Sequence, residues 1–305
     1  MFAENIYNPT RILLNIATAD RPQNYVFWPM GSSREKLHFF SLLTGFADQT
    51  GQEISIATLA NNSQPLLKFF PSLTKRIVKV EVPGSSITQA FSDELLPLTC
   101  YLLNSDRPLQ GKIFFTNVGT YLDGRLSDQW RRSNRRELSH VNLVRHILGL
   151  PPSVPPQLID LGPLPTVDDL VFFAPVANFF QVDYHAFLPM AEKCRASGLR
   201  VAWNFSETEF ARLDTGFASQ IAGDILFKGS LVEALRFAKM SKLVVAARSG
   251  FCELLSLCNC NYGIVHGPGC NGPERTYWCL DFFGSKPRFE YSWDEVAPFE
   301  VSNFC

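Results

Sequence analysis

The sequence predicts an α/β protein of two domains, each built on a parallel β-sheet covered by helices. Short apolar runs alternate with segments whose apolar residues recur at helical spacing, a pattern typical of parallel sheets. The length of 305 residues suits two domains of ordinary size. A proline-dense stretch, residues 151–165, separates two such series and is expected to be a linker, because proline continues neither element. Two such domains would face a cleft, where ligands commonly bind.

The first series begins with a strand predicted at 24–30, a short aromatic and aliphatic run that a Gly-Ser-Ser turn ends. The helix after it has apolar residues at helical spacing, with Ser32 or Ser33 as N-cap and Gly51 as its stop. The alternation then continues with strand 53–60, a short helix at 63–73, strands 76–82 and 111–119, and a helix at 135–150.

The second series restarts after the linker. A Ser-x-x-Glu capping box at Ser206 and Glu209 opens one helix, and Ser230 opens another. The remainder after 267 is aromatic-rich, and we expect mixed helix and coil there. The predicted elements are strand 168–176, helix 184–198, strand 199–205, a mostly helical 206–223, strand 224–229, helix 230–241, strand 242–250, helix 251–259 and strand 261–267.

Composition narrows the classes of function. The formal net charge of −1 provides no overall attraction to nucleic acid or to acidic membranes. The chain lacks an apolar run of the roughly 18 residues that would suggest a membrane-spanning helix. Its start lacks the basic and apolar regions of a signal peptide, so we expect a cytoplasmic protein.

Eight cysteines raise the question of a metal site. Five of them lie between Cys252 and Cys279, but without the C-x2-C spacing that zinc sites commonly use. Because Cys252 and Cys258 fall in a predicted buried helix, we expect them to be core residues and expect no metal.

The clearest candidate site is the turn Arg248-Ser249-Gly250, between a predicted strand and a predicted helix. Open α/β sheets bind ligands at this place, where free N–H groups and the helix dipole favour an anion. Arg248 would supply a forked cation, Ser249 a hydroxyl and a cap, and Gly250 close approach to the backbone. A phosphate or diphosphate is the natural ligand; an ordinary turn with a surface arginine is the alternative.

The order of segments around this turn resembles the carboxyl-terminal domain of GT-B glycosyltransferases. Residues 229–233, Gly-Ser-Leu-Val-Glu, and 242–245, Lys-Leu-Val-Val, match a segment that precedes a strand, a small-residue turn and a helix in that group. The nearest likeness is to bacterial heptosyltransferase-type and related polysaccharide-assembly transferases. In the first half, 26–60 and 66–82 are similar to the family's segments, but 29–39 stands where an aspartate base would be expected.

This resemblance implies a GT-B-like fold of two Rossmann-like domains facing a cleft. Residues 1–155 would bind the acceptor and 166–290 the nucleotide sugar, and we expect the tail, 291–305, to return to the amino-terminal domain. Glu253 would accept the ribose hydroxyls, as acidic residues on this helix do in many GT-B enzymes, while a loop histidine such as His266 is also commonly just exposed. The donor-binding residues expected from the family are Arg248, Ser249, Gly250, Glu253, His266 and Ser230.

The general base that would accept the proton of the acceptor hydroxyl is open among three residues. Glu35 lies in the first turn of a predicted helix, where glutamate also simply complements the helix dipole. His38 lies on the same helix and could instead be half buried. Asp123 follows strand 111–119 in a Leu-Asp-Gly sequence that is also an ordinary turn.

A basic segment, 125–146, contains six arginines and two histidines against two acidic residues. We expect Arg131, Arg132 and Arg135 to bind a phosphorylated, acidic or lipid-linked acceptor, with Trp130 as a stacking face or membrane anchor. The alternative is a solvated helix flank.

These observations predict a metal-independent glycosyltransferase without a cofactor, which moves a sugar from a nucleotide-diphosphate donor to a glycan or lipid-linked acceptor. The family suggests surface polysaccharide assembly, of lipopolysaccharide or capsule, with peripheral contact to the inner membrane and to other assembly enzymes. A hydrolysing nucleotide-sugar epimerase and a non-catalytic nucleotide-sugar-binding subunit are the alternatives. Nucleic acid is not expected as a partner, and no G-x-G-x-x-G follows a predicted strand, which disfavours a dinucleotide oxidoreductase.

Overall fold

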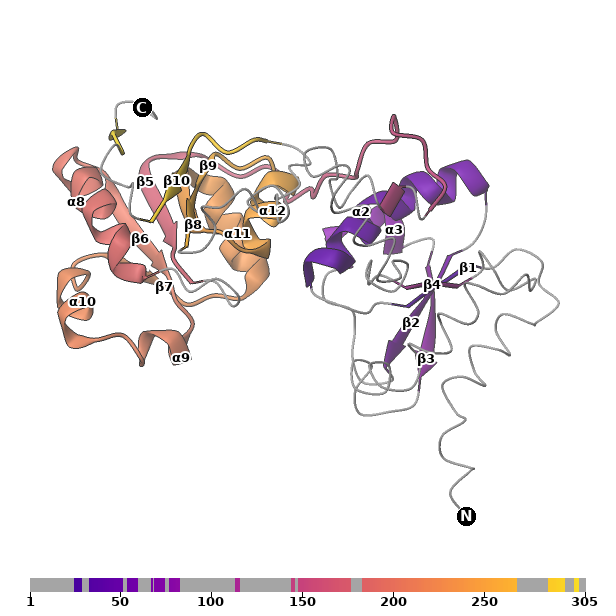
Figure 1. The fold of residues 1–305 in the computed structure, drawn as a ribbon, viewed down its shortest axis with the longest axis horizontal. Coiled ribbons are helices and arrows are strands. Elements are labelled where there is room, and N and C mark those ends of the chain that lie inside the picture. Colours follow the sequence, from indigo (N-terminus) through magenta and orange to yellow (C-terminus); the bar gives the residue numbers. More distant parts are fainter. Residues whose placement is uncertain are drawn as a thin grey trace, which may run out of the picture. The chain divides into compact units, whose positions relative to one another are not determined.

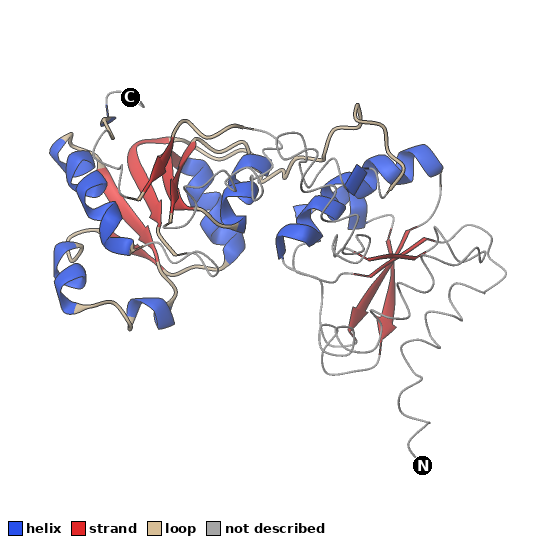
Figure 2. Cartoon of the chain, in the orientation of Figure 1, coloured by secondary structure: helices blue, strands red, loops and turns tan. Residues whose placement is uncertain are grey.

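The computed structural model divides into two compact units, Met1–Gln157 (unit 1) and Leu158–Cys305 (unit 2), shown in Figures 1 and 2. The division falls inside the proline-dense stretch. The structure describes residues 25–28, 33–51, 54–59, 67, 69–74, 77–82, 113–115, 144–145, 148–176, 183–267, 285–293 and 299–301.

Unit 1 contains a parallel sheet with the strand order β3-β2-β1-β4. Its described elements lie within the predicted segments, although α3 covers only part of the helix predicted at 63–73. Of the helix predicted at 135–150, only Val144 and Arg145 are described as helical. The elements are β1 (Tyr25–Trp28), α2 (Ser33–Thr50), β2 (Ile54–Leu59), α3 (Pro71–Thr74), β3 (Ile77–Val82) and β4 (Ile113–Phe115).

Helix α2 is buried along the predicted apolar face, on which Leu37, Phe40 and Leu43 are fully enclosed. It ends at Gly51, whose φ of +65° is a left-handed conformation that favours glycine. The backbone N–H of Gln157 donates to Ser41 O on α2 (2.6 Å), so the chain up to the division is held to unit 1.

Unit 2 contains a parallel sheet of six strands in the order β10-β9-β8-β5-β6-β7. In this sheet, β6 and β7 lie on one side of β5, and β8, β9 and β10 lie on the other. This is the strand order of a doubly wound Rossmann sheet. The elements are β5 (Val167–Ala174), η3 (Tyr184–Phe187), α8 (Leu188–Ala196), β6 (Arg200–Asn204), α9 (Glu207–Phe210), α10 (Thr215–Gln220), β7 (Ile225–Phe227), α11 (Leu231–Met240), β8 (Ser241–Ala247), α12 (Gly250–Leu257), β9 (Tyr262–His266) and β10 (Glu290–Ser292).

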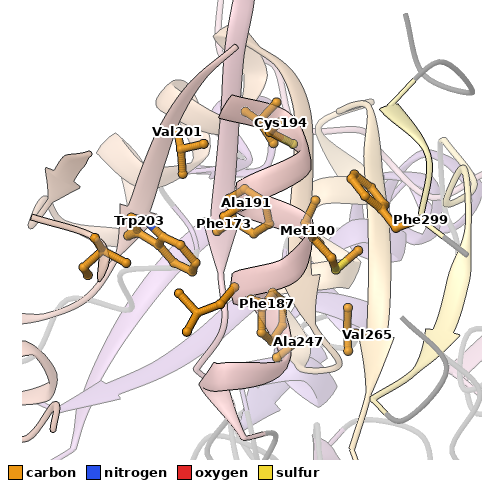
Figure 3. Packing of buried hydrophobic residues seen from close by; sticks show 14 of the residues in the cluster. Phe173, Phe187, Met190, Ala191, Cys194, Val201, Trp203, Ala247, Val265 and Phe299 are labelled. Carbon is orange, nitrogen blue, oxygen red and sulfur yellow. The ribbon is translucent and has the colours of Figure 1, made fainter. Parts of the chain in front are cut away.

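Successive phenylalanines of β5 point to opposite faces of this sheet. Phe172 meets Phe227 and Phe237, the latter on α11, at ring-centroid distances of 5.6 and 5.0 Å. Phe173 stacks on Trp203 at 4.8 Å on the other face, which α8 covers (Figure 3). The sheet is therefore covered by helices on both faces, as the alternating pattern predicts, and Figure 1 shows α8 and α11 on opposite sides of it.

Three expectations for unit 2 are corrected. The helix predicted at 206–223 is two short helices, because Asp214 caps α10 and interrupts the first. The region after 267, expected to be helix and coil, contains β10, which pairs with β9. Phe299, in the tail expected to return to the amino-terminal domain, packs instead in the unit 2 core, and Lys193 Nζ donates to its carbonyl oxygen (2.9 Å).

The described cysteines, Cys194, Cys252, Cys258 and Cys260, are buried and free, as expected for core residues. Within the described ranges, no three His, Cys, Asp or Glu side chains converge as metal ligands would. Among the helices described, none has the length and hydrophobicity that crossing a membrane requires.

Candidate functional site

The candidate site lies at the carboxyl ends of the strands in unit 2. The strand order reverses between β5 and β8, which are neighbours in the sheet although β6 and β7 lie between them in sequence. Connections from two such strands leave in opposite directions, which opens a crevice outside their carboxyl ends where doubly wound folds bind ligands. The connection from β8 to α12 at this point is Arg248-Ser249-Gly250, the turn that the sequence singled out.

The backbone of this turn is well defined. Arg248 N–H donates to Val265 O (2.9 Å), so the ladder between β8 and β9 continues one residue past β8. Ser249 is the N-cap of α12, in extended conformation, and its Oγ accepts the N–H of Phe251 (3.3 Å). Gly250 is the first residue of the helix. The turn therefore brings the start of α12 directly to the switch point.

Two charged side chains at this turn are buried. Arg248 is 4% exposed and Glu253, in the first turn of α12, is fully enclosed. The surface arginine of the alternative interpretation is therefore not what the structure shows. Between them, burial raises the pKa of the Cys252 thiol to about 12; Glu253 adds to the shift and Arg248 opposes it. Enclosing charges of both signs is costly unless each has a partner.

The amino ends of α11 and α12 differ in how they are capped. At α11, Ser230 and Glu233 form a capping box, in which Glu233 Oε2 accepts the Ser230 N–H (2.7 Å) and Ser230 Oγ accepts the Glu233 N–H (3.4 Å). Glu233 Oε2 also accepts the hydroxyl of Ser230 (2.7 Å). This bond, and then the one from the Ser230 N–H, lower the pKa of Glu233, so the helix end carries its own carboxylate. At α12, the residue in the position of Glu233 is Cys252, so no capping box forms, although Glu253 follows in the same first turn. Both helix ends therefore carry a carboxylate, and the end of α12 is the one that lies at the switch point.

His266 is the last residue of β9 rather than a loop residue, and its side chain is 12% exposed. Its Nε2 lies 2.8 Å from Glu290 Oε2 on β10, and the N–H of Trp293 donates to its carbonyl oxygen (2.8 Å). His266 directly follows Val265, the residue that accepts the N–H of Arg248. The structure therefore brings His266 and Arg248 to the same edge of the sheet.

Of the three candidates for the general base, the structure describes the side chain of one. His38 is fully enclosed on α2 rather than half buried. The side chain of Glu35 lies outside the described part, and Asp123 lies outside the described residues altogether. The predicted acceptor-binding residues Arg131, Arg132 and Arg135 also lie outside them.

Sequence reasoning missed a second group of polar side chains in unit 2. Asp214 Oδ2 lies 2.7 Å from His185 Nε2 and accepts the hydroxyl of Tyr184 (2.8 Å). Residues 184–198 and 206–223 were both expected as helices, and no signal in either segment indicated that they meet. An Asp-Thr-Gly sequence at 214–216 could have indicated a helix cap at Asp214.

No protein-family model matches the chain, and no curated protein does. Solved structures do match. The ADP-heptose lps heptosyltransferase II of E. coli has a TM-score of 0.53 at 15% identity, covering 92% of this chain and 96% of that one. The E. coli heptosyltransferase WaaC with ADP has a TM-score of 0.54 at 15% identity, covering 92% and 97%. A glycosyl transferase family 9 structure from Veillonella parvula has a TM-score of 0.55 at 10% identity, covering 92% and 89%. The resemblance to GT-B glycosyltransferases is confirmed, and at these identities it is a likeness of fold.

Proposed function

We propose that the protein is a glycosyltransferase that moves a sugar from a nucleotide-diphosphate donor to a glycan or lipid-linked acceptor in surface polysaccharide assembly. The observation that carries this proposal is the buried Arg248 beside the start of α12, at the switch point of a Rossmann sheet. A cation next to a helix N-terminus favours a diphosphate. The transferases that share the fold supply the reaction class, and one of them is described with ADP.

In this proposal the donor diphosphate binds at the turn, where Arg248 neutralises it and the amides of Ser249 and Gly250 approach it. Glu253 is fully enclosed, so accepting hydroxyl groups of the ribose requires the first turn of α12 to move. His266 lies beside the phosphates. Ser230, whose hydroxyl caps α11, shapes the neighbouring loop. As the glycosidic bond of the donor breaks, negative charge grows on the diphosphate, and a positioned cation and helix end stabilise that charge without a metal ion.

The residues proposed to bind the acceptor lie outside the described part of the structure. We propose that Arg131, Arg132 and Arg135 bind a phosphorylated or otherwise anionic acceptor. Glu35 and Asp123 remain predicted bases, while the enclosure of His38 argues against direct contact with an acceptor hydroxyl. An acceptor of the lipid-linked kind would bring the protein to the inner membrane surface.

Calorimetry with ADP, UDP, GDP and CDP tests the donor site directly. We expect one of them to bind, and Arg248→Ala to weaken that affinity about 10- to 100-fold, the typical contribution of a charge-assisted hydrogen bond. Because Arg248 is buried, Arg248→Lys should accompany it: it keeps the charge, loses the fork and should weaken affinity less. Arg200→Gln is the matched control. Arg200 is the first residue of β6, at the end of the strand away from the proposed site, and its ion pair with Asp169 is exposed. If none of the four nucleotides binds, or if a folded Arg248→Ala binds as the wild type does, the proposal is wrong.

A further inference from the structure

Unit 2 contains an oriented histidine that the proposed donor site does not use. His185 Nε2 lies 2.7 Å from Asp214 Oδ2, and Tyr184 donates its hydroxyl to the same oxygen (2.8 Å). Asp214 Oδ1 accepts the N–H of Phe217 (2.8 Å) as the N-cap of α10. The imidazole also meets the Phe217 ring edge-on at 5.3 Å and stacks beside Tyr184 at 4.9 Å, so its plane is fixed.

The charge of Asp214 settles which nitrogen of His185 carries the proton. The N–H of Phe217, and then the hydrogen bonds of Tyr184 and His185, lower the pKa of Asp214 to about 2. The carboxylate is therefore ionised at any working pH and can only accept. Nε2 of a neutral His185 must then be the N–H, which leaves the Nδ1 lone pair as a proton acceptor. The side chain of His185 is 42% exposed, so a substrate can approach it.

The position of η3 places His185 at the same end of the sheet as the turn at Arg248. The chain enters η3 after leaving the carboxyl end of β5, one of the two strands that flank the switch point. Phe187 of η3 meets Phe173 of β5 at 6.3 Å and belongs to the same buried cluster as Ala247, the last residue of β8 (Figure 3). Arg248 follows Ala247 directly.

We propose that His185 is the general base of the transfer reaction, in place of the three residues predicted from the sequence, an inference that rests on the proposed function. Its Nδ1 takes the proton of the attacking hydroxyl while the hydroxyl oxygen bonds to the anomeric carbon. The bond from that carbon to the diphosphate oxygen breaks, and the nucleoside diphosphate leaves with the electron pair. Asp214 and Tyr184 are positioning residues, which hold the tautomer and the ring and stabilise the imidazolium that forms.

The titratable groups that face His185 in the described structure are Asp183, Tyr184 and Asp214. Asp183 accepts the backbone N–H of His185 (2.9 Å) as the N-cap of η3. Asp214 is the one bonded to the ring.

Release of nucleoside diphosphate from ADP-glucose, UDP-glucose and GDP-mannose, with water as acceptor, tests this assignment. His185→Gln should lower kcat about 10²- to 10⁴-fold, the usual contribution of a general base. It should leave the calorimetric affinity for the nucleoside diphosphate unchanged. Asp214→Asn keeps a good helix cap but no longer fixes the tautomer, so it should lower kcat without changing the calorimetric affinity for the nucleoside diphosphate. Arg200→Gln should turn over as the wild type does.

The results distinguish a failure of the base assignment from a failure of the proposed function. If nucleotides bind and the wild type turns over while His185→Gln keeps its kcat, the base assignment is wrong and the donor site stands. If the wild type binds nucleotides but releases none from any probe, His185 does not activate water and the assignment also falls. If no nucleotide binds, the proposed function itself fails. Long-range ¹H–¹⁵N spectra provide a readout without substrate: Nδ1–H on neutral His185 would overturn the assignment, and Nε2–H is expected.

Discussion

Arg195, on α8, and Asp224, just before β7, form a two-point ion pair, with Nε to Oδ1 at 2.9 Å and Nη2 to Oδ2 at 2.5 Å. Asp224 Oδ2 also accepts the indole N–H of Trp203 (2.7 Å), and its side chain is only 7% exposed. One carboxylate thus joins a helix, β6 and the edge of the unit 2 sheet. The hydrogen bond to Asp224 raises the pKa of Arg195 against the opposing effect of burial, so the guanidinium stays charged.

Asp224→Ala should therefore destabilise unit 2. It leaves a half-buried guanidinium and a buried indole N–H without their acceptor, and we expect a loss of about 2–3 kcal/mol in the free energy of unfolding. Urea denaturation followed by Trp fluorescence measures it. Asp169→Ala is the matched control, because its pair with Arg200 is exposed on both sides and should contribute little. Equal losses for the two variants would contradict this account.

A second prediction concerns Gly263, over which the ring of Phe289 lies. A Cβ at Gly263 would come within 2.1 Å of Phe289 Cζ, so Gly263→Ala must displace the segment that leads into β10. We expect a loss of about 1–3 kcal/mol, typical of overpacking. The pair of His266 with Glu290 should loosen as well, because Glu290 directly follows Phe289. Gly223→Ala, where a Cβ meets nothing within 4 Å, should be close to neutral by the same urea measurement.

A third prediction follows from the carboxylate of Asp214. Its pKa falls from the ordinary 3.8 to about 2 in the folded chain, so the ionised form is favoured by folding. The corresponding stability is fully present above the ordinary pKa and is lost as the pH falls through 3.8 towards 2. Asp214→Asn should remove this part of the acid sensitivity, while the asparagine still caps α10. Thermal unfolding at a series of pH values between these limits compares the two proteins, and parallel curves would show that Asp214 does not contribute.

A fourth prediction concerns Cys252, which follows the proposed diphosphate turn. Because burial raises its pKa to about 12, the thiol is protonated at pH 8 and should resist alkylation in the native protein. Peptide mass spectrometry after iodoacetamide treatment should find Cys252 unlabelled, and labelled once urea unfolds the chain. Rapid labelling without denaturant would show that the start of α12 opens readily.

Much of this fold could be predicted from the sequence, because apolar runs and helical spacing identify strands and helices locally. The order of the strands could not, since adjacency in the sheet depends on crossovers: β5 and β8 are neighbours although their first residues, Val167 and Ser241, are 74 positions apart. Strand β10 was missed because three residues give no period, and what makes them a strand is their pairing with β9. The break at Asp214 depended on a side-chain cap that competes with continuation of the helix.

The candidate site, like the fold, could be predicted only in part from the sequence. The turn at Arg248 could be predicted because a strand, small residues and a helix follow one another directly. Its burial could not, because that depends on what packs over it. The pairs of His185 with Asp214 and of His266 with Glu290 join residues 29 and 24 positions apart, and a single sequence carries no signal for such pairing.

The last prediction separates the two roles of Ser249. As the N-cap of α12, its hydroxyl satisfies the Phe251 N–H, so Ser249→Ala should cost about 1 kcal/mol of stability. In the proposed donor complex the same hydroxyl lies at the diphosphate, so affinity for the bound nucleotide should fall as well. Ser206→Ala removes the cap of α9, a helix that opens with its own capping box, and should cost stability without changing nucleotide affinity. Calorimetry and urea denaturation of both variants measure the two effects. If both variants lose stability and neither loses affinity, then Ser249 only caps the helix, and the diphosphate does not reach its hydroxyl.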